Sequence, residues 1–235
     1  MNVLITGGTR GIGRALVLKF AENKANKIVV FARNQQKLEQ LKTECDDKFN
    51  NQIITQTIDF SESDIEEQLE KTFHQLNMHF HIVLNNAGLL INKPFKDTTL
   101  LDWNQSLSVN LLAPAFIIKN IVKLNKPEET CHVVNITSMG GVQGSVKFPG
   151  LSSYSASKAA LVNLTECLAE EFKENNITMN SLALGAVQTE MLEEAFPGYK
   201  TNVTPTQMAD FIHHFSRSYN ELINGKVIPV SNSIP

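Results

Sequence analysis

Short apolar segments alternate with longer amphipathic segments along most of the chain. The apolar segments are rich in Val and Ile, as buried strands are, and lie at 2–6, 27–32, 53–58, 81–85, 132–136 and 177–184. Segments with an apolar residue at every third or fourth position predict helices between them, at 14–23, 35–49 and 64–76. This alternation is typical of repeated βαβ units. The sequence therefore predicts an α/β fold in which helices cover both faces of a parallel sheet.

Three stretches lack clear periodicity: 87–98, 139–153 and 190–204. Each follows a predicted strand, and open parallel sheets bind their ligands outside the carboxyl ends of the strands. We therefore expect these stretches to border a binding crevice, with 190–204 as the substrate loop. A chain of 235 residues with no repeat and no low-complexity linker predicts a single domain over 1–235.

Charge and composition limit the possible partners. A formal net charge of −3 and a pI near 6.1 give no basic field for nucleic acid. The opening residues "MNVLITGG" have neither the basic segment nor the cleavage site of a signal peptide. The apolar stretches look shorter than a membrane span. We expect a cytoplasmic protein with no membrane and no nucleic-acid partner.

The cysteines and histidines do not suggest a metal site. No CxxC spacing occurs, so we interpret the three cysteines as reduced packing residues, at Cys45, Cys131 and Cys167. His79 and His81 have the spacing that places both rings on one side of a strand, but no carboxylate completes a ligand set. His213 and His214 are predicted to be solvated on a surface helix.

The segment "TGGTRGIG", Thr6 to Gly13, follows the first predicted strand and opens a helix. Its glycines permit a tight turn and let backbone N–H groups approach a pyrophosphate, beside the positive end of the helix. The alternative is an ordinary glycine-rich turn. The segment predicts a dinucleotide site formed by Gly7, Thr9, Arg10, Gly11, Ile12 and Gly13.

The end of the second strand bears on the choice of cofactor. Dinucleotide folds use an acidic residue here for the ribose 2′-OH of NAD, or an arginine for the 2′-phosphate of NADP. Ala32 occupies the acidic position and Arg33 follows it, while Arg10 lies in the glycine loop. Two guanidinium groups without a carboxylate favour NADP(H) over NAD(H). The alternative is that both arginines are solvated surface residues.

Two more strand ends carry candidate cofactor contacts. Asp59 closes the third strand in "TIDFS", where it could accept the adenine amino group or cap the next helix, with Ser61 and Ser63 as competitors. The fourth strand ends in "LNNAG", whose small residues suit a backbone that lies against a nucleotide. The candidates there are Asn86, Ala87 and Gly88.

The segment "SSYSASKAA" places Tyr154 and Lys158 at i and i+4, on one helical face, among small side chains. A free tyrosine titrates near pH 10, too high for efficient proton exchange at neutrality. A lysine one turn away, together with the positive nicotinamide of an oxidised cofactor, would lower that pKa. The pair would then act as an acid in carbonyl reduction and as a base in alcohol oxidation. For an isolated pair, the alternative is an amphipathic tyrosine and a surface lysine.

Two polar residues complete a candidate tetrad. Ser138 follows the fifth strand in "NITSMGG", where its hydroxyl could bond a substrate carbonyl at the edge of the sheet. Asn110 is a poor helix former inside the apolar segment "LSVNLLAPAF" and could instead bond a helix carbonyl.

In this order, "TGGTRGIG", "NNAG", Asn110, Ser138 and "YSASK" resemble the short-chain dehydrogenase/reductase family, in its compact single-domain branch. The resemblance covers nearly the whole chain. It implies a doubly wound, seven-stranded parallel Rossmann sheet and hydride transfer between a nicotinamide and a carbonyl or alcohol carbon of a small molecule. It also implies a homodimer or homotetramer, with surfaces on the helices around Asn110 and after Tyr154.

The resemblance also implies roles for single residues. Tyr154 is expected to be the proton donor or acceptor, and Lys158 to bind the nicotinamide ribose and lower the tyrosine pKa. Ser138 is expected to orient the substrate, and Asn110 to hold a water in a proton relay. The cofactor contacts in "GAVQTEM" are expected at Gly185, Val187 and Thr189.

The chain departs from the family pattern at three places. Fifteen residues, 139–153, separate Ser138 from Tyr154, which is more than is usual. Leu184 stands where the family has proline. The last predicted strand, within 226–235, lacks the closing acidic-Gly-Gly element.

The alternatives concern both function and substrate. A catalytically silent dinucleotide-binding protein, redox-sensing or scaffolding, is the main alternative, although such a protein has no need of the tetrad. A nucleotide-sugar epimerase or dehydratase, a third alternative, normally requires a larger C-terminal domain. Small ketones, acyl thioesters, sugars and pterins all remain open as substrates, with a 3-oxoacyl reductase as an alternative. The expected apolar lining is Phe148, Met191, Leu192 and Phe196.

Overall fold

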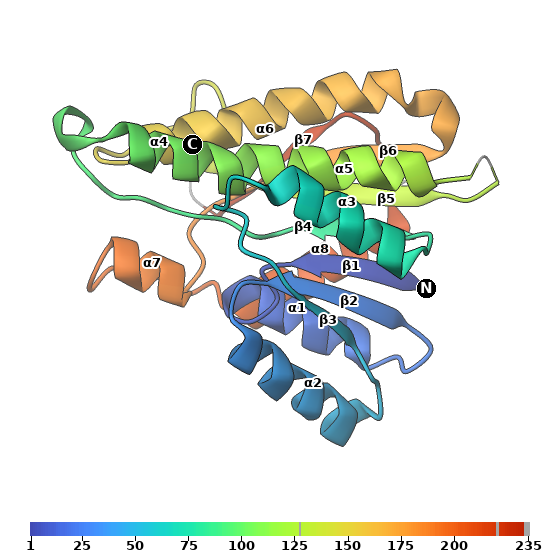
Figure 1. The fold of residues 1–235 in the computed structure, drawn as a ribbon. Coiled ribbons are helices and arrows are strands. Elements are labelled where there is room, and N and C mark those ends of the chain that lie inside the picture. The colour runs from blue at the N-terminus through green and yellow to red at the C-terminus, as the bar shows by residue number, and fades with distance from the viewer. Residues whose placement is uncertain (127, 220, 233–235) are drawn as a thin grey trace.

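The computed structural model describes residues 1–126, 128–219 and 221–232, which form one twisted sheet between two layers of helices (Figure 1). Within these residues, seven parallel strands pair in the order β3-β2-β1-β4-β5-β6-β7. The strands are β1 Asn2–Thr6, β2 Lys27–Ala32, β3 Ile54–Thr57, β4 Ile82–Asn85, β5 Cys131–Ser138, β6 Ile177–Leu184 and β7 Val227–Val230. The predicted doubly wound, seven-stranded Rossmann sheet is confirmed.

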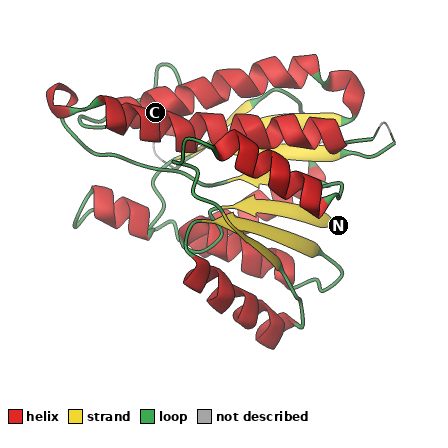
Figure 2. Ribbon diagram, in the orientation of Figure 1, coloured by secondary structure: helices red, strands yellow, loops and turns green. Residues whose placement is uncertain are grey.

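Helices cover both faces of the sheet (Figure 2). They are α1 Gly11–Ala21, α2 Gln35–Phe49, α3 Ile65–Leu76, α4 Leu100–Leu107, α5 Ala113–Leu124, α6 Ser152–Glu171, α7 Glu190–Ala195 and α8 Pro205–Ser218. Helices α1, α2 and α8 share one hydrophobic core with one face of the sheet, and α3, α5 and α6 share another with the opposite face. Alternate strand residues supply the two cores: Val3 and Ile5 enter the first, and Leu4 enters the second.

Helix α7 lies apart from both layers, at the edge where the strands end (Figure 1). The stretch 190–204 was expected to be irregular, but its first six residues form this helix. Thr189 begins α7, because its side chain accepts a hydrogen bond from the Leu192 N–H. Of the predicted last strand, Val227–Val230 is observed, and residues 233–235 lie outside the described residues.

Helices α4 and α5 are joined by a π-helical turn, Ser108–Leu112, into one helical run, Leu100–Leu124. This run is 25 residues long and its most apolar window has a mean hydropathy of 1.5, which is sufficient in length and composition to cross a membrane. The prediction that no apolar stretch reaches that length is therefore wrong. In the fold, Ile117, Ile118 and Ile121 of the run are buried against the sheet, as in a core helix.

The structure corrects two predictions about cysteines and histidines. Cys167 is exposed, whereas the other two cysteines are buried, so the packing role fails for Cys167. His79 and His81 precede β4, which begins at Ile82, so they do not share a strand face, although their rings lie 4.8 Å apart. His213 is half-buried, with its ring 4.5 Å from that of Phe20, rather than solvated.

Candidate active site

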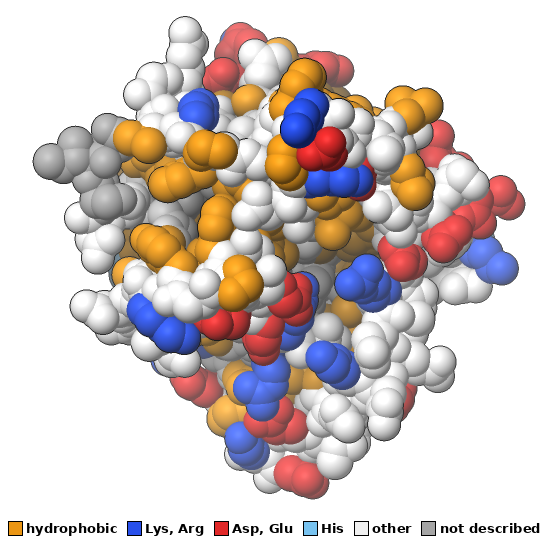
Figure 3. Space-filling model, turned by 90° about the vertical axis from the view of Figure 1, so that its left-hand side faces the viewer, with side chains coloured by type: hydrophobic (Ala, Val, Ile, Leu, Met, Phe, Trp, Pro, Cys, Tyr) orange, Lys and Arg blue, Asp and Glu red, His pale blue; other side chains and the backbone are white. Residues whose placement is uncertain are grey.

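A cleft of about 480 Å³ runs along the carboxyl ends of the strands. Figure 3 views the molecule from this edge, where hydrophobic side chains gather over the upper half and charged side chains of both signs lie next to one another below. All the predicted cofactor residues line the cleft, as do Ser138, Tyr154 and Lys158. Asn110 is the one member of the predicted set that does not line it. The tertiary structure thus brings nearly the whole predicted set together.

The glycine loop is packed so closely that larger residues cannot replace two of its glycines. Gly7 has a φ of +68°, and a Cβ there would lie 2.9 Å from the Cα of Ala87. A Cβ on Gly13 would lie 2.2 Å from the carbonyl oxygen of Gly7. Glycine is the residue that tolerates both conditions. The loop therefore turns tightly beside the end of β4.

The start of α1 fits an anionic ligand. Its N-cap residue, Arg10, makes no side-chain capping hydrogen bond, and its first turn contains no acidic residue. The N–H groups of this turn therefore have no side-chain acceptor, and they adjoin the cleft. Free N–H groups at a helix N-terminus bind phosphate well. The residues present thus fit a dinucleotide pyrophosphate.

Thr6 ties the glycine loop to the segment after β4. Its hydroxyl oxygen accepts hydrogen bonds from the N–H groups of Asn86 and Ala87, at 3.0 and 2.9 Å. The Asn86 side chain donates in return to the Thr6 carbonyl, at 2.9 Å. Asn86 therefore holds the two loops together, whatever it contributes to a ligand.

Arg33 and Asp59 lie near each other at the far end of the cleft. The Asp59 carboxylate accepts hydrogen bonds from the backbone and the hydroxyl of Ser61, at 2.9 and 2.7 Å. Burial raises the pKa of Asp59, but these two bonds and the Arg33 charge outweigh it and lower the pKa. The N-cap of α3 is Asp64, so the alternative that Asp59 caps this helix is wrong.

Tyr154 lies in the first turn of α6, half-buried, beside the end of β5. Burial raises the pKa of its phenol, and a hydrogen bond with the Ser138 side chain works in the opposite direction. The lowering of this pKa by Lys158 together with an oxidised nicotinamide stays a prediction.

Lys158 is 3% exposed, and its ammonium donates a hydrogen bond to the Ile136 carbonyl oxygen at 2.8 Å. Burial lowers its pKa from 10.5 to about 8. The amine also lies near the backbone of the cleft wall, because a Cβ on Gly88 would be 3.6 Å from it. Lys158 is therefore a buried cation that is hydrogen-bonded to β5, rather than a surface lysine.

Asn110 lies in the π-helical turn and is fully buried. Its amide group donates to the Leu89 carbonyl and to the Ser157 hydroxyl, both at 2.9 Å, and its oxygen accepts from the Leu89 N–H at 2.8 Å. Both amide hydrogens are therefore used, and one lone pair of the oxygen is left. The side chain links α6 to the cleft wall at Leu89.

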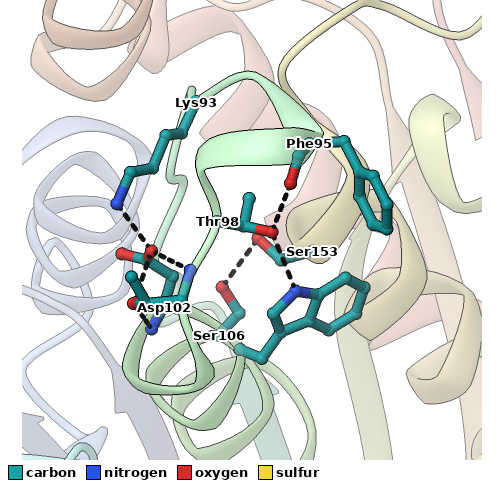
Figure 4. A network of polar contacts seen from close by, with 8 residues as sticks. Lys93, Phe95, Thr98, Asp102, Ser106 and Ser153 are labelled. Atoms are coloured by element: carbon teal, nitrogen blue, oxygen red, sulfur yellow. Dashed lines mark hydrogen bonds and ion pairs between the residues drawn. The ribbon is translucent and has the colours of Figure 1, made fainter.

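A polar network fixes the start of α4, and so the position of the helix that carries Asn110 (Figure 4). Asp102 accepts from the Lys93 ammonium and from the Thr99 N–H, both at 2.7 Å. The Lys93 hydrogen bond is the largest influence that lowers the pKa of Asp102, to about 2. Further along α4, Ser106 donates to Ser153 of α6 at 3.3 Å.

The long segment between β5 and α6 does not displace Ser138. Ser138 is the last residue of β5, and its hydroxyl accepts from the Gly140 N–H at 3.2 Å. The segment is held by its own side chains: Ser145 donates to the Met139 and Val142 carbonyls, and Lys147 donates to Ser145. Extra residues are thus accommodated away from the tyrosine.

The turn after β6 shows how leucine replaces the proline of the family. Leu184 pairs with Val230 as the last residue of β6, and the Gly185 N–H donates to the Val230 carbonyl at 2.9 Å. A Cβ on Gly185 would lie 2.6 Å from the Ser231 hydroxyl oxygen. Strand pairing therefore holds this turn. The Thr189 hydroxyl, a predicted cofactor contact, accepts the capping hydrogen bond of α7 and still lines the cleft.

The cleft contains all four residues of the expected apolar lining, Phe148, Met191, Leu192 and Phe196. It also contains residues that the sequence reasoning missed: Phe60, Leu90, Gln105 and Val109. Gln105 and Val109 are one helical turn apart, a spacing that could have indicated a shared face. The lining glutamates Glu190 and Glu194 were missed as partners of the glycine loop, because no local signal links positions so far apart.

No group of three or more His, Cys, Asp or Glu side chains that could hold a metal ion occurs among the described residues. The Nδ1 of His79 lies 3.3 Å from the carboxylate of Glu129, and His81 accepts a hydrogen bond from the Asn2 N–H at 3.0 Å. These residues lie before β4, at the opposite edge of the sheet from the cleft.

Comparison with known families decides the family. A model of the short chain dehydrogenase family matches residues 1–200. The chain belongs to this family. The predicted resemblance to short-chain dehydrogenases is therefore confirmed, and the oxidoreductase character of the family fits the cleft described above.

Among short-chain dehydrogenases, curated relatives include two enzymes named 3-oxoacyl-(acyl-carrier-protein) reductase. The one from Aquifex aeolicus (strain VF5) is 28% identical and aligns with 98% of this chain and 96% of its own length. The one from Synechocystis sp. (strain ATCC 27184 / PCC 6803 / Kazusa) is 29% identical over 81% of this chain and 75% of its own length.

Solved structures of short-chain dehydrogenases share this fold. A 4-hydroxyisoleucine dehydrogenase complexed with NADH superimposes with a TM-score of 0.86 at 24% identity, covering 99% of this chain and 97% of that one. A short chain dehydrogenase from Burkholderia cenocepacia J2315 in complex with NADP gives 0.82 at 22% identity, covering 98% and 96%. At such identities the likeness shows the fold alone.

Proposed function

We propose that the protein is an NADP(H)-dependent oxidoreductase that transfers a hydride between the nicotinamide and a carbonyl or alcohol carbon. The observation that carries this proposal is the convergence of Ser138, Tyr154 and Lys158 on one wall of the cleft whose other end is the glycine loop. A silent binding protein has no use for this arrangement. The bound nicotinamide supplies or accepts the hydride.

The side chains of this chain provide the proton and the positioning. Tyr154 donates its phenolic proton to the carbonyl oxygen in reduction and accepts it back in oxidation. The Ser138 side chain, which forms a hydrogen bond with Tyr154, orients the substrate oxygen beside the phenol. Lys158 provides a buried positive charge for the nicotinamide ribose and the phenolate, and Asn110 positions the wall at Leu89 and a relay water. Gly185, Val187 and Thr189 complete the cofactor contacts.

The preference for NADP(H) rests on Arg10 and Arg33, which both line the cleft. Ala32 offers no carboxylate to a ribose 2′-OH. The solved neighbours include one complexed with NADH and one with NADP, so the fold does not select between the two cofactors. A 2′-phosphate near two guanidinium groups gains the electrostatic energy that a 2′-OH does not.

The proposed substrate is a small carbonyl or alcohol compound with an apolar body, which fits Phe148, Met191 and Phe196 at the end of the cleft. The curated relatives are named for reduction of 3-oxoacyl groups, and such a thioester is one candidate of this chemistry. Residues 1–235 act as a single domain in this proposal, with 190–204 as the substrate loop.

We further infer a cytoplasmic homodimer or homotetramer. The three free cysteines agree with a reducing compartment. Leu100 and Leu101 are 77% and 64% exposed at the start of α4, which suits a subunit contact near Asn110. Light scattering of the purified protein measures its oligomeric state, and a monomer would remove this part of the proposal.

The decisive experiment assays the purified protein with NADPH and with NADH against a panel of ketones, 3-oxoacyl thioesters and alcohols. We expect turnover with NADPH and about a tenfold preference over NADH, which Arg33→Ala removes and Arg217→Ala on α8 does not. Cofactor binding without turnover on any compound would support the silent alternative. Absence of cofactor binding would reject the proposed function altogether.

A further inference from the structure

Arg10, one of the two arginines assigned to the 2′-phosphate, already has a partner in the structure. Its guanidinium Nη1 lies 2.5 Å from Oε1 of Glu194, on α7. Both side chains are accessible, with 35% and 63% of their surface exposed. The ion pair therefore joins the glycine loop to the substrate loop across the mouth of the cleft.

Helix α7 presents two carboxylates to the glycine loop. Glu190 and Glu194 are four positions apart and so share one helical face, and both line the cleft. A Cβ built on Gly11 would lie 3.5 Å from Oε2 of Glu190. Glu193 points elsewhere: its carboxylate accepts from the Gly198 N–H and the Lys200 ammonium, both at 3.2 Å.

We propose that Glu194 is a specificity-determining residue that limits the preference of the site for a dinucleotide bearing a 2′-phosphate. This inference rests on the proposed function. A 2′-phosphate has to compete with the Glu194 carboxylate for Arg10, and the two anions repel each other. NAD(H) has no 2′-phosphate and leaves the ion pair intact. Arg33 then supplies most of the preference for NADP(H), because the Glu194 carboxylate offsets the contribution that Arg10 would otherwise make.

Substitution of the carboxylate by an amide tests this directly. In E194Q, Arg10 is released and the repulsion is lost, while the side-chain size is preserved. We expect the ratio of the NAD⁺ to the NADP⁺ dissociation constant to rise about two- to fivefold, the range that the loss of an exposed ion pair produces. Isothermal titration calorimetry on the cofactor-free protein measures both constants without any substrate.

E193Q is the matched control, because it changes the same charge on the same helix but not the partner of Arg10. We expect its ratio to equal that of the wild-type protein. A double-mutant cycle of R10Q and E194Q measures how much of the effect of E194Q acts through Arg10. We expect this part to disappear when E194Q is combined with R10Q. Circular dichroism spectra confirm that each variant is folded.

An unchanged ratio in E194Q, or an equal rise in E193Q, would overturn the inference. Its failure is distinct from that of the proposed function. If the wild-type protein binds NAD⁺ more tightly than NADP⁺, the assigned cofactor preference is wrong, yet a shift of the ratio confined to E194Q still supports the role of Glu194.

Discussion

Tyr154 carries the proposed proton transfer, and two opposing influences act on its phenol. Burial raises its pKa, and the hydrogen bond with Ser138 lowers it. In the proposed function, the positive charges of Lys158 and of an oxidised nicotinamide lower the pKa further. The phenol would then exchange its proton efficiently near neutrality.

Removal of the phenolic oxygen should abolish turnover and preserve binding. In Tyr154→Phe we expect kcat to fall about 10²- to 10⁴-fold, the usual contribution of a general acid. The dissociation constant for NADP⁺ should change little, because the glycine loop is untouched. Steady-state kinetics and calorimetry measure the two quantities. Tyr219→Phe, at the exposed end of α8, is the control, and retained activity in Tyr154→Phe would contradict the mechanism.

Lys158 should lower the stability of the protein at neutral pH. Its pKa is about 8 in the folded protein against 10.5 ordinarily, so the unfolded chain binds more protons between these values. The free energy of unfolding therefore rises with pH across this window, by up to about 3 kcal/mol. Lys158→Met should lack this rise and should be inactive. Urea denaturation at the two ends of the window measures the change in the free energy of unfolding. The same pH dependence in the wild-type protein and in Lys158→Met would contradict the prediction.

Among the elements, the segment between β5 and α6 is one whose length departs from the family pattern. Its internal hydrogen bonds let it extend without moving Ser138, and it delivers Phe148 to the cleft while leaving this side chain 59% exposed. Exposed apolar surface often marks a binding site, and in the proposed function the substrate covers this ring.

Phe148→Ala should therefore weaken the binding of apolar substrates. We expect KM to rise about fivefold with a smaller change in kcat, because part of a phenylalanine side chain no longer contacts the substrate. Initial rates over a range of concentrations of one apolar ketone measure both constants. Phe95→Ala is the control, since Phe95 is comparably exposed but does not line the cleft. An equal effect of the two changes would mean that Phe148 has no contact with the substrate.

For the whole molecule, a buried histidine joins the sheet to α8. His132 on β5 bonds to the Ser216 carbonyl through Nδ1 at 2.9 Å and to the Asn180 amide through Nε2 at 3.1 Å. Burial lowers its pKa to about 4, although the Ser216 bond opposes this. The folded protein therefore keeps His132 neutral where the unfolded chain protonates it.

This difference predicts a loss of stability in mild acid. Between pH 6.5 and 4 the unfolded chain binds one proton more than the folded protein. The free energy of unfolding therefore decreases as the pH is lowered through this window, by up to about 3 kcal/mol. His132→Gln should be less stable at neutrality, because the packing changes, but its stability should depend less on pH in this window. Chemical denaturation at several pH values tests this, and His74→Gln on α3 is the exposed control. An unchanged pH dependence in His132→Gln would exclude His132 as the cause.

The order of elements, the parallel sheet and the family could be inferred from the sequence, because period and spacing are local properties. Buried strands read as continuous Val and Ile runs, and the glycine loop and the Tyr154–Lys158 spacing each lie within one short segment. These local signals also located the cleft, since parallel strands end at one edge. The helix in 190–204 was missed because six residues are too few to show a period.

Contacts between distant segments depended on the tertiary structure. The hydrogen bond of the Lys158 ammonium, the hydrogen bonds of the Asn110 side chain and the Arg10–Glu194 pair join residues many positions apart. No pattern along the chain encodes such pairs, because they follow from how whole elements pack. Burial is likewise a property of the packed molecule, and it raises the pKa of the Tyr154 phenol, an effect that the sequence neighbours of Tyr154 do not indicate.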